Sequence, residues 1–193
     1  MKTPFRRLLA AGTLALGASA FGADPAGLVD FGRFTAPAKG EFVEVQVKKN
    51  LLSLAAKLAE KHEPDAAALL RGLELVRVNV IGLDDSNRDE LTQRAADVAA
   101  QLTDRGWERV VTVQQAGAEN VSVFVKARGD EAVEGVVVTV LDPGGEGVFV
   151  NVVGDIRTEQ LAKLGDKLNL PMLKQAGEAV EKAKEAAEAP AAP

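Results

Sequence analysis

The stretch Val133–Gly154, VEGVVVTVLDPGGEGVFVNVVG, sets the character of the fold. It contains two runs rich in valine, residues 133–141 and 148–154, and β-branched and aromatic residues of this kind are enriched in strands. Residues 142–147 (DPGGEG) separate the runs, and a short link that carries glycine is typical of a hairpin turn. The stretch therefore predicts two antiparallel strands.

Similar patterns extend outward from this hairpin. Strands are predicted over residues 41–47, 73–81, 108–114 and 120–128. The last two precede the hairpin without an intervening helix, so the four final strands are expected to form a meander. The result is an α+β fold class: a two-layer domain with a mixed, mostly antiparallel sheet of about six strands and helices packed on one face.

Helices are predicted mainly in the first half of the chain. Helical spacing is found over residues 50–62, 65–71, 87–105 and 158–165. The stripe expected to face the core in the first of these helices consists of Leu51, Leu54, Ala55, Leu58 and Ala59. The lone Trp107, which follows the glycine that ends the third helix, is predicted to be a core residue.

The first twenty residues have the pattern of an export signal, with basic residues, a short apolar run and an Ala-x-Ala cleavage site before Phe21. The predicted organisation is a signal peptide (1–20), a leader segment (21–40), a single α+β domain (41–173) and an Ala/Glu/Lys-rich tail (174–193). Leu28, Phe31 and Phe34 of the leader are candidates for local docking. The expected location is the periplasm or the outside of the cell.

Composition argues against several classes of function. Cleavage of residues 1–20, which carry three basic and no acidic side chains, would take the formal net charge from −5 to −8. An acidic chain does not suit nucleic-acid binding, and no later segment is expected to span a membrane. The sequence has no cysteine and one histidine, His62, so we expect no catalytic triad, metal site or cofactor.

The chain also resembles a known family, that of the bacterial domain of unknown function 4252. The stretches that carry the resemblance are EFVEVQVKKNLLSLAAK (41–57), LRGLELVRVNV (70–80), GWERVVTV (106–113), VSVFVK (121–126) and VFVNVVGDI (148–156). The resemblance implies an exported or envelope-associated bacterial protein of no established activity, and it supplies no catalytic residues. Many relatives are lipoproteins, and this chain departs from them because no cysteine follows its apolar run.

Strand alternation singles out one candidate partner-binding face. If helices cover the side of the sheet that carries Val148, Val150 and Val152, the opposite side should be open. That open face is predicted to carry Arg77, Asn79, Ser122, Phe124, Lys126, Thr139 and Asn151. The leading hypothesis is a non-enzymatic envelope module that binds a protein or a small ligand there, in an oligomeric state that the sequence leaves open.

Two alternatives remain beside this hypothesis. One is a small hydrolase that uses carboxylates such as Asp84, Asp85 and Asp155, which requires two of them to converge in a pocket. The other is a purely structural role.

Overall fold

The computed structural model describes residues 24–114, 119–129, 132–157 and 160. The predicted signal peptide (1–20) and tail (174–193) lie outside the described residues. So does the helix expected at 158–165, apart from Gln160.

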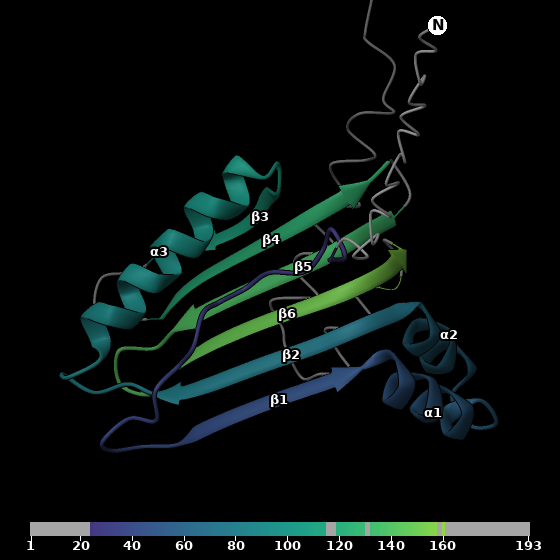
Figure 1. The fold of residues 1–193 in the computed structure, drawn as a ribbon, viewed down its shortest axis with the longest axis horizontal. Coiled ribbons are helices and arrows are strands. Elements are labelled where there is room, and N and C mark those ends of the chain that lie inside the picture. Colours follow the sequence, from purple (N-terminus) through teal and green to yellow (C-terminus); the bar gives the residue numbers. More distant parts are fainter. Residues whose placement is uncertain (1–23, 115–118, 130–131, 158–159, 161–193) are drawn as a thin grey trace, which may run out of the picture.

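One antiparallel sheet organises the described chain, and its six strands lie side by side in the order β1-β2-β6-β5-β4-β3 (Figure 1). The strands are β1 (Phe42–Lys48), β2 (Leu73–Gly82), β3 (Glu108–Val113), β4 (Asn120–Arg128), β5 (Ala132–Leu141) and β6 (Glu146–Arg157). The hairpin predicted from residues 133–154 is formed by β5 and β6. Because β6 returns next to β2, it joins the meander to the first two strands. The predicted α+β class with about six strands is confirmed.

The two faces of the sheet have different compositions because side chains alternate along each strand. One face, the valine face, carries mainly valines, including Val123, Val138 and Val150. The other, the aromatic face, carries Phe124 and Phe149 in a separate cluster with Trp107. Trp107 is only 4% exposed, so its predicted place in the core is confirmed.

Three helices are found among the described residues: α1 (Lys49–Ala59), α2 (Pro64–Gly72) and α3 (Arg88–Asp104). Leu91, Val98 and Leu102 attach α3 to the aromatic face. Leu52 of α1 and Leu69 of α2 instead join the cluster of the valine face. The helices therefore contact both faces rather than one, which differs from the expected two-layer arrangement.

The orientation of α1 corrects the predicted buried stripe. Leu52 and Ala56 are its buried residues, whereas Leu51, Leu54 and Leu58 are 53%, 54% and 73% exposed. The helix is apolar around most of its circumference, so spacing alone did not decide which side meets the sheet.

Residues 24–34, here called the strap, cross the aromatic face over β5 and β6 (purple in Figure 1). Val29 and Phe31 of the strap are each 3% exposed. Phe31 and Phe34 both contact the ring of Phe149, with centroids 5.7 and 4.9 Å away. The strap therefore covers part of the face that was expected to be open.

Candidate functional site

Asn151, the amide at the centre of the predicted site, is fully buried and holds the strap in place. Its Oδ1 accepts a hydrogen bond from the backbone N–H of Val29 at 3.0 Å. Its Nδ2 donates to the carbonyl oxygens of Gly27 (3.0 Å) and Val136 (3.2 Å). A buried amide with both ends satisfied is stable in an apolar environment, so Asn151 serves as an internal clamp rather than a surface residue.

Two glycines bring the strap close enough for this clamp to form. A Cβ on Gly27 would lie 1.9 Å from the carbonyl oxygen of Glu134. A Cβ on Gly135 would lie 2.6 Å from the Cα of Gly27 and 2.5 Å from the ring of Trp107. Any larger residue at either position would push the strap away from β5.

Helix α3 holds the strap from its other side. Arg94 donates hydrogen bonds to the carbonyl oxygens of Arg33 (2.6 Å) and Phe31 (3.3 Å), and its guanidinium lies 4.7 Å from the ring centre of Phe34. Arg105 donates to the carbonyl oxygen of Leu28 at 3.3 Å. Side chains of α3 and of Arg105, which follows it, therefore hold the strap where it lies beside the helix on the sheet (Figure 1).

These contacts overturn the expectation that the candidate face is open. Four of its seven predicted residues are buried, namely Asn79 (3% exposed), Phe124 (1%), Thr139 (6%) and Asn151 (0%). The physical reason is that α3 and the strap together shield the apolar side chains of this face from water. The other three, Arg77, Ser122 and Lys126, are half-buried. Whether any of the seven contacts a partner stays a prediction.

The half-buried members of this set lie in different places. Ser122 reaches the groove described next, together with the buried Thr139. Lys126 donates from Nζ to the carbonyl oxygens of Arg105 (2.8 Å) and Gly106 (3.3 Å), and so satisfies the C-terminal end of α3. Arg77 lines a separate cavity of about 330 Å³ with Asn79, beneath the strap.

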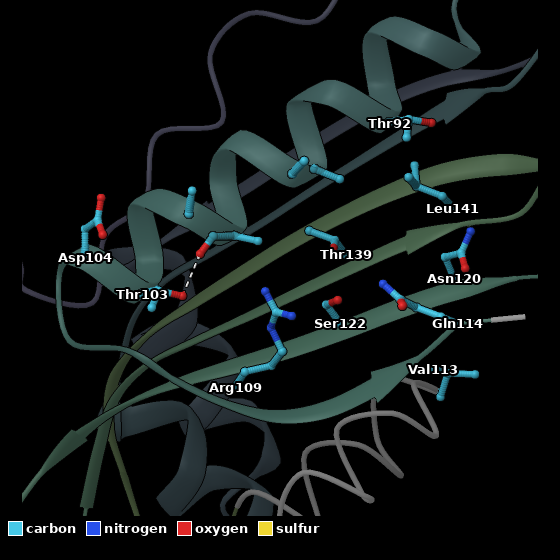
Figure 2. A pocket seen from close by; sticks show the side chains of 14 residues that line it. Thr92, Thr103, Asp104, Arg109, Val113, Gln114, Asn120, Ser122, Thr139 and Leu141 are labelled. Atoms are coloured by element: carbon cyan, nitrogen blue, oxygen red, sulfur yellow. Dashed lines mark hydrogen bonds between the residues drawn. The ribbon is translucent and has the colours of Figure 1, made fainter.

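A groove remains uncovered between α3 and strands β3, β4 and β5 (Figure 2). Its volume is about 540 Å³, within the range of small-molecule sites. The sheet side of the groove is polar, because Arg109, Gln114, Asn120, Ser122 and Thr139 all line it. Figure 2 shows the Arg109 side chain rising from β3 towards Ser122 and Thr139.

The groove exists because α3 presents small side chains on that side. Ala95, Ala96, Ala99 and Ala100 line it, whereas the bulky residues Leu91, Val98 and Leu102 lie on another side of the helix and pack into the core. From Thr92 to Thr103 the lined part of α3 is about 16 Å long. The hydroxyl of Thr103 is used within the helix, since it donates to the carbonyl oxygen of Ala99 at 2.9 Å.

Arg109 is the strongest candidate for contact with a ligand. Its guanidinium lies 4.8 Å from the ring centre of Phe124, which fixes its position over the aromatic face. Among the described residues it makes neither an ion pair nor a side-chain hydrogen bond, so its N–H donors remain available. Of the described residues that line the groove, Asp104 is the only acidic one.

Sequence reasoning did not find Arg109, Gln114 or Asn120. Arg109 pairs with Phe124 while Val111 pairs with Val123, so one extra residue is accommodated between them. This bulge turns Arg109 onto the same face as Ser122, against the plain alternation of β3. A sequence signal for the bulge is not evident.

The carboxylates of the hydrolase alternative do not converge. Asp84 and Asp85 follow the end of β2, whereas Asp155 lies near the opposite end of β6, about 30 Å away along the strand. Hydrogen bonds from Ser86 hold the pKa of Asp84 below its ordinary value of 3.8. Asp155 pairs with Arg128, raising the pKa of that guanidinium, and Asp85 pairs with Arg88.

The described part of the chain contains no cluster of three or more histidine, cysteine, aspartate or glutamate side chains that could hold a metal ion. Its helices are all too short or too polar to cross a membrane.

Comparison with known proteins gives one match. The family model of the domain of unknown function DUF4252 matches residues 38–164, which confirms the resemblance found in the sequence. No curated protein and no solved structure matches the chain.

Proposed function

The chain belongs to the family of the domain of unknown function DUF4252, and we propose that it is an exported, non-enzymatic protein that binds a small carboxylate ligand in the groove between α3 and the sheet. The observation that carries this proposal is Arg109, whose guanidinium stands in the groove without an acidic partner among the described residues. Arginine offers a planar fork of donors that matches a carboxylate.

The rest of the lining defines the body of the ligand. Ser122 and Thr139 lie opposite each other on β4 and β5, and Gln114 and Asn120 add two amides. These groups suit a ligand with several hydroxyl or amide groups. The alanines of α3 form a flat apolar wall that suits a sugar ring or an extended peptide backbone. Because Arg109 is the one cation in the described part of the lining, the ligand should carry one negative charge.

A binding role fits the lining better than catalysis does. A nucleophilic serine needs a base within hydrogen-bond distance, and the described lining that surrounds Ser122 contains neither a histidine nor a lysine. Asp104, which carries the one carboxylate of the described lining, points away from Ser122 and Arg109 (Figure 2). The predicted export signal and the family resemblance support a role in the envelope.

The proposal is tested by NMR titration of the purified chain with glucuronate, an acidic sugar, and with N-acetyl-Ala-Ala, a peptide carboxylate. We expect at least one probe to shift the backbone amides of β3, β4 and α3 around the groove, with a Kd near 1 mM, which corresponds to about −4 kcal/mol. Neutral glucose, which lacks the carboxylate, serves as the negative control.

Two variants locate the binding. Arg109→Gln removes the charge, and Ala96→Trp fills the groove from an exposed position on α3; both should abolish the shifts. Gln101→Trp places the same ring on an exposed part of α3 outside the groove and should leave them intact. The proposal is wrong if neither probe shifts these amides, or if binding survives Arg109→Gln and Ala96→Trp.

A further inference from the structure

Helix α1 carries an apolar stripe that no described part of the chain covers. Leu51, Leu54 and Leu58 are each more than half exposed. At about 100° per residue they lie on one side of the helix, roughly opposite the buried Leu52 and Ala56. Scattered exposed leucines are ordinary, but three at this spacing on about two turns of helix form a continuous patch.

The charge around the stripe differs in sign from that of the whole chain. Residues 48–61 contain four lysines and one glutamate, whereas the chain has a formal net charge of −5. The glutamate, Glu60, is already paired with Arg71. Lys57 follows Leu54 by three positions within the helix, which makes it a neighbour of the stripe on the surface, and Lys61 lies in the turn just after the helix ends at Ala59.

Most of these lysines are free to meet an external anion. All four are exposed, and Lys49 alone makes an ion pair in the described structure, a loose one of 3.7 Å with Glu74. Leucines flanked by lysines are typical of helices that lie in the interface of an anionic bilayer, where the lysine stems extend towards the headgroups.

We infer that α1 is a membrane-contact helix that inserts Leu51, Leu54 and Leu58 into the surface of a bilayer containing anionic lipid, while Lys57 and Lys61 contact the headgroups. This inference does not depend on the groove or on its ligand.

A second copy of the chain is a less suitable partner for the leucine stripe of α1 than a bilayer. Three half-exposed leucines offer on the order of 200 Å² of apolar area, far below the roughly 800 Å² that each partner of a stable dimer buries.

A site-specific fluorescent label tests the inference in the full chain. Because the sequence has no cysteine, Leu54→Cys gives a single attachment point for an environment-sensitive dye such as NBD. Val113→Cys, which is 41% exposed on β3 at the far edge of the sheet from β1, is the matched control. Both labelled variants keep the apolar run near the N-terminus. Binding of vesicles through that run would therefore not produce a difference between the two labels.

Vesicles of phosphatidylcholine and phosphatidylglycerol in equal parts should shift the emission of the Leu54→Cys label to the blue and raise its intensity about twofold or more. The control label should not respond. Vesicles of phosphatidylcholine alone, or about 1 M NaCl, which shortens the Debye length to about 3 Å, should remove most of the effect. In the Leu54→Cys chain, the additional substitution Lys57→Glu should weaken the response of the label to the anionic vesicles.

Three results would overturn the inference. They are no response of the label at position 54 to anionic vesicles, an equal response at position 113, and a response that grows with protein concentration in the absence of vesicles. The last result would indicate contact with a second copy, and sedimentation velocity would reveal the dimer.

Discussion

Replacing the clamp residue Asn151 by leucine should weaken the whole domain. Leucine keeps the branched shape of asparagine but is larger and apolar, so it leaves the backbone N–H of Val29 and the carbonyl oxygen of Gly27 without their partner in a buried position. Each unsatisfied buried group costs about 1–3 kcal/mol, so we expect the free energy of unfolding to fall by about 4 kcal/mol. The loss of stability has an upper limit, because the strap can instead detach from the sheet. Detachment would let water bind the N–H of Val29 and the carbonyl oxygen of Gly27, at the cost of exposing Phe149.

The assay is urea denaturation followed by the fluorescence of Trp107, the only tryptophan, which lies beside Gly135 under the strap. With a slope of about 2 kcal/mol/M, the midpoint should fall by about 2 M. Chymotrypsin should also cleave the variant faster at Phe31 and Phe34, since a released strap exposes both rings.

Asn79→Leu is the matched control for this substitution. Asn79 is a buried asparagine on the same face, but its side chain makes no hydrogen bond to the strap within the described structure. Its replacement should change the midpoint by less than about 0.5 M. The reasoning would be refuted by an Asn151→Leu midpoint within about 0.3 M of that of the unaltered chain, or by an equal loss in Asn79→Leu.

Three other outcomes follow from the geometry. Gly27→Ala should release the strap and accelerate its cleavage by chymotrypsin, because the added methyl group overlaps the backbone of β5; an unchanged cleavage rate would contradict the close approach. Leu52→Ala should cost about 3 kcal/mol in urea denaturation, and Leu54→Ala less than about 0.5 kcal/mol, with the reverse order contradicting the orientation of α1. Because its folded-state pKa is lowered, the ionised Asp84 stabilises the fold at pH values above 3.8, and this contribution is lost as the pH falls through the lower pKa. A carboxyl NMR titration of Asp84 should therefore have its midpoint below 3.8 and move upward in Ser86→Ala, whereas a midpoint at or above 3.8 contradicts the hydrogen bond.

Strand positions were determined by the sequence because they depend on local chemistry. Alternating valines and a link that carries glycine favour a hairpin regardless of the rest of the fold. Strands β5 and β6 accordingly form where residues 133–154 predicted them. The end of α3 near Gly106 and the burial of Trp107 followed from local signals in the same way.

The accessible site was decided only by tertiary structure. Alternation assigns Asn151 and Phe124 to one face, but it does not say what covers that face. The cover consists of α3 and the strap, whose Val29 lies 122 residues before Asn151. In α1, leucines and alanines together cover more than half of the circumference, so only packing against the sheet selects Leu52 for burial. A bulge in β3 likewise turns Arg109 into the groove. Such contacts form between segments that are distant in the sequence and meet only in the folded chain. Local sequence patterns therefore do not predict them.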